Sequence, residues 1–146
     1  MIRLAQPDEA DAARGLLREY ARGLGNAICF RSFEREVSEL PERYPVILLA
    51  FEADQLAGCV AMRTISAGVA EMKRLYVRPA FQGLGLGREL AETMIQTAKA
   101  AGFHRLRLDT LPHMERAIAL YRMLGFREIP PYGDNPAEAL CFELAL

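Results

Sequence analysis

The segment that decides the fold begins as Glu71-Met72-Lys73-Arg74-Leu75-Tyr76-Val77-Arg78-Pro79 and continues, two residues later, as Gln82-Gly83-Leu84-Gly85-Leu86-Gly87-Arg88. Its first half belongs to a run, Ala70 to Val77, that alternates as a strand does and stops before Pro79. Its second half leads into a helical pattern from about Gly87 to Ala101. Glycines let the backbone approach a ligand, and a helix N-terminus offers unpaired N–H groups. The segment is therefore suited to hold a phosphate group.

Three interpretations of this glycine-rich turn compete. A dinucleotide-binding fingerprint requires Gly-x-Gly-x-x-Gly directly after a strand, with an acidic residue about 20 positions further on. Asp109 fits that spacing, but Arg88 stands at the third glycine position and the loop does not follow the strand directly. A nucleotide phosphate-binding loop would continue with Lys-Ser or Lys-Thr, which this chain lacks. The third interpretation is a turn that only packs a helix on a strand.

Apolar periodicity predicts the elements around this segment. Strand patterns cover residues 2–5, 46–51, 56–65, 70–77, 105–109, 126–129 and 139–146, and helical patterns cover 8–24, 33–40, 87–101 and 114–124. The order contains hairpins and a crossover. It predicts an α/β fold with a mixed, mostly antiparallel sheet of about six to seven strands and about four helices.

Length and composition exclude several classes of protein. The 146 residues fit one domain, 1–146. The 18 Lys and Arg residues nearly balance the 19 Asp and Glu residues, so we expect no nucleic-acid partner. No apolar run reaches the ~18 residues needed to cross a bilayer, so we expect no membrane partner. Cys29, Cys59 and Cys141 lie among apolar neighbours, which is typical of reduced core thiols in a cytoplasmic protein.

A wider pattern distinguishes among the three interpretations of the turn. Downstream of the segment, the chain reads Leu120-Tyr121-Arg122-Met123-Leu124-Gly125-Phe126. The combination of Gln-x-x-Gly-x-Gly at 82–87 with Leu-Tyr-x-x-x-Gly-Phe at 120–126 resembles the GNAT superfamily of N-acetyltransferases. The resemblance is strong over 71–126 and only topological at the start of the chain. It implies a GNAT-like acyl-CoA N-acyltransferase fold, with acetyl-CoA as co-substrate and no metal.

The resemblance assigns the cofactor contacts to the backbone. It implies that N–H groups from Gln82 through Arg88 hold the pyrophosphate of coenzyme A, with Leu75 donating its N–H to the thioester carbonyl and Val77 pairing with the pantetheine arm. The implied cofactor-binding residues are Leu75, Tyr76, Val77, Gln82, Gly83, Leu84, Gly85, Leu86, Gly87 and Arg88. Met114 stands where relatives often carry Asn, so one polar contact near the cofactor is missing.

The same resemblance assigns two side chains to the chemistry. Glu71 stands where many relatives carry a general base, and Tyr121 stands where they carry the acid that protonates the departing thiolate. An amine attacks a thioester only when neutral, and an alkylamine with a pKa near 10.4 is mostly protonated at neutral pH, so a base is required. Without the resemblance, Glu71 would be interpreted as a solvated charge and Tyr121 as a core residue.

Other polar residues have plainer interpretations. Asp109, at a predicted strand end, is expected to cap a helix or turn. His104 and His113 lack the spacing of metal ligands and are expected in loops. Lys73 shares a face with Glu71 if the strand alternates regularly, and a bulge would reverse that phase.

The leading functional hypothesis is direct acetyl transfer from acetyl-CoA to a primary amine of a small molecule. Acetylation of a protein N-terminus or lysine, a coenzyme A sensor without catalysis that docks on a partner protein, and a plain dinucleotide module are the alternatives. Tyr132, Asp134 and Asn135 lie in a Pro-flanked loop that could line the acceptor site. A homodimer paired through a sheet edge is one assembly that such a small fold allows.

Overall fold

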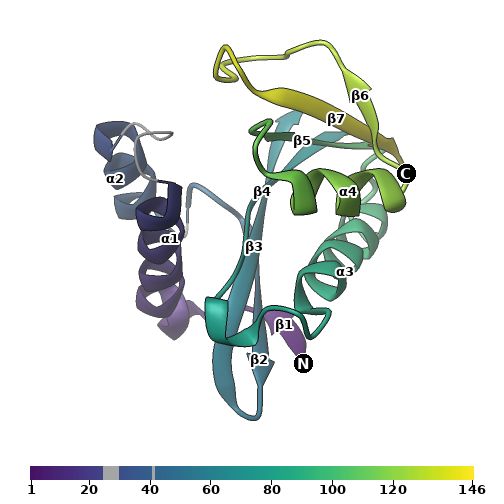
Figure 1. Cartoon of the computed structure of the whole chain (residues 1–146). Coiled ribbons are helices and arrows are strands. Elements are labelled where there is room, and N and C mark those ends of the chain that lie inside the picture. The colour runs from purple at the N-terminus through teal and green to yellow at the C-terminus, as the bar shows by residue number, and fades with distance from the viewer. Residues whose placement is uncertain (25–29, 41) are drawn as a thin grey trace.

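The computed structural model describes residues 1–24, 30–40 and 42–146 of the chain. Within this part, seven strands form one sheet in the order β1-β2-β3-β4-β5-β7-β6 (Figure 1). Neighbouring strands run antiparallel, except that β4 and β5 pair in parallel. The expected α/β fold with a mixed, mostly antiparallel sheet and about four helices is confirmed.

The bounds of the elements lie within a few residues of the expected ones. The strands are β1 (Ile2–Leu4), β2 (Val46–Glu52), β3 (Gln55–Ser66), β4 (Val69–Val77), β5 (Arg105–Thr110), β6 (Arg127–Ile129) and β7 (Leu140–Ala145). The helices are α1 (Ala10–Leu24), α2 (Phe30–Ser38), α3 (Leu86–Ala100) and α4 (Glu115–Met123), with 3-10 turns η1 (Pro7–Glu9) and η3 (Pro79–Phe81). Throughout the described ranges, no helix combines the length and the apolar character needed to cross a membrane.

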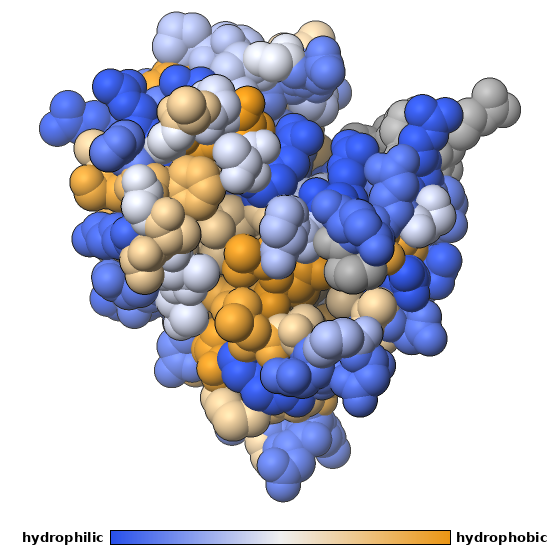
Figure 2. Space-filling view, turned by 180° about the vertical axis from the view of Figure 1, so that it is seen from behind, coloured by the Kyte–Doolittle hydropathy of each residue, from blue (hydrophilic) through white to orange (hydrophobic). Residues whose placement is uncertain are grey.

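Helices cover both faces of the sheet. Figure 1 shows α1 and α2 on one side of β3 and β4, and α3 and α4 on the other. Each side has its own apolar core: Leu16, Phe33 and Tyr44 belong to the first, and Leu90 and Met94 belong to the second. Seen from behind, the molecule carries an apolar area near its middle that is bordered by hydrophilic residues (Figure 2).

Strand β4 changes the phase of its side chains at Arg74. Ala70 and Met72 lie in the core on the α3 side, but beyond Arg74 the residues that pack against this core are Leu75 and Val77. Arg74 has a φ of 61°, in the left-handed region that residues other than glycine rarely adopt. The pairing with β3 is irregular at the same place, so this is a β-bulge.

Strands β4 and β5 separate soon after they meet. Their parallel ladder joins Val69–Glu71 to Arg105–Arg107. Beyond it, β4 pairs with β3 on one side, and β5 pairs with β7. In the described structure, the other edge of β4 therefore has no strand partner beyond Glu71. Its backbone groups are available to an extended ligand.

The cysteines and histidines lie largely as expected. Cys59 and Cys141 are buried free thiols, and burial raises the pKa of Cys59 to about 12. Cys29 lies outside the described residues. His104 and His113 lie between regular elements, in a bend and a turn.

Candidate active site

A small cavity of about 60 Å³ lies where β4 and β5 separate. Strand β4 contributes Leu75 to its wall, helix α4 contributes Tyr121, and the end of β5 contributes Asp109 and Thr110. The fold thus brings Leu75 and Tyr121, two of the residues singled out from the sequence, to one place. Met114 lines the same cavity from the start of α4, where it accepts a weak hydrogen bond from the Thr110 hydroxyl to its Sδ at 3.6 Å.

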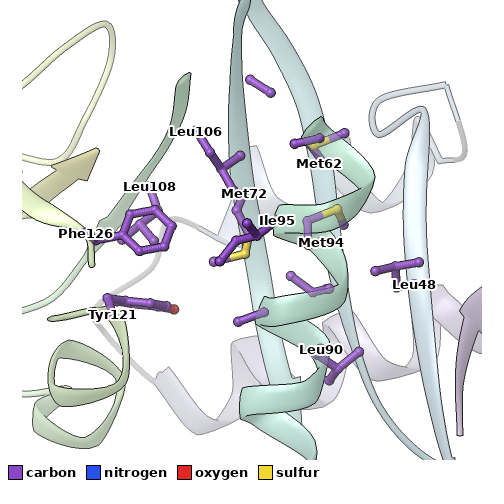
Figure 3. Close-up of a cluster of buried hydrophobic side chains, with 14 of the residues drawn as sticks. Leu48, Met62, Met72, Leu90, Met94, Ile95, Leu106, Leu108, Tyr121 and Phe126 are labelled. Atoms are coloured by element: carbon purple, nitrogen blue, oxygen red, sulfur yellow. The ribbon is translucent and has the colours of Figure 1, made fainter. Parts of the chain in front are cut away.

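Tyr121 combines an apolar ring environment with a place in the wall of this cavity. The side chain is only 6% exposed, and its ring meets Phe126 edge-on with 5.8 Å between centroids. Figure 3 shows it at the α4 edge of the buried cluster, with its hydroxyl pointing from α4 toward the middle of the view. Burial raises the pKa of Tyr121, so the phenol keeps its proton at neutral pH. A protonated phenol beside the cavity can act as a general acid.

The glycine-rich turn has the backbone geometry of an anion site. Gly83 and Gly85 have φ values of 84° and 83°, and Gly85 is the N-cap of α3. The first helical N–H to bond back is that of Glu89, which donates to the carbonyl of Gly85 at 3.0 Å. In the described structure, the N–H groups from Gly83 through Arg88 have no backbone acceptor. These donors, at the positive end of a fifteen-residue helix, suit a pyrophosphate.

Gln82, by contrast, uses its N–H in a hydrogen bond within the protein. Its N–H donates to the carbonyl of Pro79 at 3.3 Å, and its side-chain amide donates to the carbonyl of Val77 at 3.1 Å. The set of available donors therefore begins one residue later than the sequence pattern suggests. Gln82 instead ties the turn to the end of β4, the strand whose edge is free.

The two arginines that flank the turn are also paired. Arg78 donates to Glu19 on α1 at 2.8 Å and to the carbonyl of Leu56 at 2.8 Å. Its hydrogen bond lowers the pKa of Glu19. Arg88 pairs with Glu92 on the surface of α3 at 2.6 Å. The side chain of Arg78 is thus held toward α1, and that of Arg88 lies along α3.

Glu71 is fully buried on the face of the sheet that carries α1 and α2. It is 1% exposed, and its two oxygens accept hydrogen bonds from Arg63 Nε at 2.8 Å and from the Tyr132 hydroxyl at 2.6 Å. Lys73 Nζ lies 4.0 Å from the carboxylate, so Lys73 does share its face, because the bulge comes one residue later. Glu71 lines a cavity of about 440 Å³ that is distinct from the one lined by Tyr121.

Asp109 does not cap a helix or turn, in contrast to our expectation. It lies inside β5, and the N-cap position of α4 is occupied by Met114. Its Oδ2 accepts a hydrogen bond from the Asn135 amide at 2.9 Å, and its Oδ1 lies 3.8 Å from Lys73 Nζ. The strand extends one residue further than predicted, and its end faces the separation of β4 and β5.

A larger cavity of about 420 Å³ adjoins the small one. The two share six lining residues: Tyr20, Lys73, Arg74, Asp109, Thr110 and Met114. Asp134 lines both this cavity and the one next to Glu71, and Tyr132 and Asn135 line only the one next to Glu71. The loop between β6 and β7 therefore borders both larger cavities.

Two ion pairs at the site were not predicted from the sequence. Arg63 lies opposite Glu71 in the β3–β4 pairing, where opposite charges attract, but no register of these two strands was predicted from the sequence. Arg74 binds Glu36 on α2 through two hydrogen bonds of 2.6 and 2.7 Å. Burial alone would raise the pKa of Glu36, but the pair with Arg74 lowers it. No local pattern indicates this second contact, because it depends on the bulge.

The sequence of the whole chain decides the family. Residues 10–126 match the family model described as Acetyltransferase (GNAT) family. The chain belongs to the GNAT family of acetyltransferases. It is an acetyl-CoA-dependent N-acetyltransferase, and the cavity lined by Leu75 and Tyr121 is its candidate active site.

Relatives and solved structures of GNAT proteins agree with this assignment. The chain is 35% identical to an uncharacterized N-acetyltransferase of Schizosaccharomyces pombe, over 89% of this chain and 83% of the relative. It is 33% identical to an IAA acetyltransferase of Azospirillum brasilense, over 86% of each chain. An acetyltransferase structure from Streptococcus agalactiae superposes with a TM-score of 0.84 at 20% identity, covering 100% of this chain and 98% of the other.

Proposed function

We propose that this GNAT protein transfers the acetyl group of acetyl-CoA directly to a primary amine of a small molecule. The observation that carries the proposal is the cavity that Leu75 and Tyr121 share at the free edge of β4, the strand that leads into a turn with unpaired N–H groups. The pyrophosphate would bind the N–H groups from Gly83 to Arg88. The thioester would then lie along β4, with its carbonyl on the N–H of Leu75.

In the proposed reaction the amine nitrogen bonds to the thioester carbonyl carbon, and the carbon–sulfur bond breaks. Tyr121 gives its proton to the departing sulfur and is reprotonated from solvent. Starting from an ammonium ion, the overall reaction releases one proton. Positioning of the two reactants supplies much of the acceleration, roughly 7 to 11 kcal/mol for well-aligned groups.

Glu71 is our proposed general base, acting through water. We do not propose a direct contact between Glu71 and the amine, because Glu71 and Tyr121 line different cavities. Lys73 lines both of these cavities and lies 4.0 Å from the carboxylate. A water chain past Lys73 would connect the amine to Glu71, and such general base catalysis contributes about 10² to 10⁴-fold.

The size of the larger cavity that adjoins the cavity of Leu75 and Tyr121 favours a small acceptor. Its volume of about 420 Å³ is in the range of sites for small molecules, and it is bordered by α2 and by the β6–β7 loop. A protein acceptor is the second candidate, because the ribosomal-protein-S18-alanine N-acetyltransferase of Escherichia coli has the same fold, with a TM-score of 0.77 at 24% identity.

A panel of acceptors tests the proposal. The protein is mixed with acetyl-CoA and either small primary amines or short peptides with free N-termini and lysines, and release of the coenzyme A thiol is followed. We expect thiol release above the acceptor-free rate, with an acetylated product by mass spectrometry, for at least one small amine. Acetylation of peptides alone would favour the protein acceptor, and no acetylated product from either set would contradict the proposal.

A further inference from the structure

Asp109 occupies a position that no other acidic side chain of the described structure shares. It lines both the small cavity beside Leu75 and Tyr121 and the larger cavity proposed for the acceptor. Glu36 and Asp134 line the larger cavity but not the small one, and Glu71 lines neither. An acceptor that passes from the larger cavity toward the thioester would meet the carboxylate of Asp109 at the junction.

We propose that Asp109 binds the acceptor directly, by holding its ammonium group at the junction of the two cavities. This inference rests on the proposed acetyl transfer to an amine. An alkylamine arrives protonated at neutral pH, and a carboxylate accepts a charge-assisted hydrogen bond from it. Asp109 would fix the nitrogen next to the thioester, so the preferred acceptors are amines that carry a positive charge before they react.

The hydrogen bonds of the two carboxylates support this division of roles. Both oxygens of Glu71 already accept short hydrogen bonds, from Arg63 and Tyr132. Asp109 accepts one through Oδ2, from the Asn135 amide, whereas Oδ1 is 3.8 Å from Lys73, too far for a hydrogen bond. Within the described structure, Oδ1 of Asp109 therefore keeps its capacity to accept a hydrogen bond from a ligand.

Lys73 limits what else can bind at the junction. Its Nζ lies between Asp109 at 3.8 Å and Glu71 at 4.0 Å, so one lysine charge faces two carboxylates. Because Glu71 is also paired with Arg63 at 2.8 Å, an ammonium group of the acceptor would compete with Lys73 for the carboxylate of Asp109.

A purely structural role for Asp109 gives a different expectation. Its bond to Asn135 also ties the β6–β7 loop to β5, so loss of the carboxylate could act through the loop. Asp109→Asn removes the charge but keeps an oxygen for Asn135. Asn135→Ser removes the tie but keeps the charge. The two variants separate binding of the ammonium group from placement of the loop.

The test uses the small alkylamine that the wild-type protein acetylates fastest, and the alcohol with the same carbon skeleton as a competitive inhibitor. We expect Asp109→Asn to raise KM for the amine at least about tenfold and to change Ki for the alcohol less than about twofold. Asn135→Ser should raise KM much less. Acetyl-CoA should raise the melting temperature of wild type and of both variants, and this rise shows that the variants fold. If Asp109→Asn does not fold, Asp109→Ser takes its place.

Three results would overturn the inference: an unchanged KM in the Asp109 variant, equal losses of amine and alcohol binding, or an equal rise of KM in Asn135→Ser. The proposed function has a separate point of failure. If the wild-type protein acetylates no small amine, the proposed transfer to a small-molecule amine is refuted. If it does, and the Asp109 variant behaves like wild type, only the role of Asp109 is refuted.

Discussion

Tyr121 is prepared for acid catalysis by its surroundings rather than by a charged neighbour. Phe126 and Phe142 surround its ring, with centroids 5.8 and 6.5 Å away, and burial raises the pKa of its hydroxyl. The protonated form is the one that can give a proton to a thiolate. Tyr121 differs from an ordinary core tyrosine because it also lines a cavity.

Replacement of Tyr121 by Phe should reduce kcat by about a hundredfold or more, because the departing thiolate loses its acid.

In the wild-type protein, kcat should not fall as the pH rises through about 10, the ordinary pKa of tyrosine, since the raised pKa keeps the acid form of Tyr121 present. The measurement is kcat against pH, with the acetyl-CoA dissociation constant as the control. A kcat in Tyr121→Phe within about twofold of wild type would remove Tyr121 from the mechanism.

Replacement of Glu71 by Gln should lower kcat by about 10²-fold or more, because the amide cannot take a proton from the amine. The amide also keeps only one oxygen for Arg63 and Tyr132, so stability should fall as well. Steady-state kinetics at a temperature well below the melting point of the variant separates the two effects. Unchanged kcat in a folded variant would show that Glu71 has a structural role only.

At the scale of the element, the N-terminal turn of α3 depends on two left-handed glycines. A Cβ built on Gly85 meets no atom within 4 Å, so the cost of a larger residue there comes from its φ of 83° and not from crowding. The orientation of the N–H groups that follow depends on the same backbone angle. Stability and coenzyme A binding should therefore respond together to changes at this position.

Gly85→Ala should destabilise the protein by about 1 to 2 kcal/mol and weaken coenzyme A binding, since alanine disfavours the left-handed conformation. Gly85→Asn is the matched comparison, because asparagine tolerates that conformation better, and it should recover part of both losses. Chemical denaturation and calorimetric titration with coenzyme A give the two values. Equal affinity in Gly85→Ala and wild type would argue against the turn as the pyrophosphate site.

The pair of Glu36 and Arg74 attaches α2 to the bulge of β4. The side chains are 5% and 17% exposed, and loss of one partner leaves the other charge buried without compensation. We expect Glu36→Gln to destabilise the protein by about 3 to 5 kcal/mol. Glu39→Gln is the control, because the Arg43–Glu39 pair is about 40% exposed, at 38% and 44%, and should contribute less than about 1 kcal/mol.

The Glu36 pair also predicts an acid dependence of stability. Its pKa is lower in the folded state than the ordinary value of 4.5, so its contribution is complete above that value and is lost as the pH falls through the lower folded pKa. Wild-type stability should therefore decline below about pH 4.5 more steeply than that of Glu36→Gln. Parallel curves for the two proteins, measured by denaturation at each pH, would contradict the assignment.

At the scale of the whole molecule, the sequence predicts the order of elements well because each carries its own signal. The strand ending at Pro79, the glycine turn and the periodic helix after it are local patterns, and the structure places all three as expected. The Pro-flanked loop with Tyr132 and Asn135 is visible in the sequence, but its hydrogen bonds to Glu71 and Asp109 are not.

What the sequence does not predict depends on contacts between distant elements. The bulge at Arg74 contains no glycine that would indicate it in the sequence. It is stabilised by Glu36, which lies in another layer of the fold. Asp109 was misjudged because a strand-end aspartate is usually a cap, and its exposure to two cavities follows only from the separation of β4 and β5.

The most direct test of the account is a crystal structure of the protein with acetyl-CoA bound. We predict a pyrophosphate within hydrogen-bonding distance of N–H groups between Gly83 and Arg88. The thioester should lie against the free edge of β4, with its sulfur near the Tyr121 hydroxyl. A cofactor bound elsewhere, or a thioester that Tyr121 cannot reach, would contradict the central claim that the glycine-rich turn and the cavity beside Tyr121 form one acetyl-transfer site.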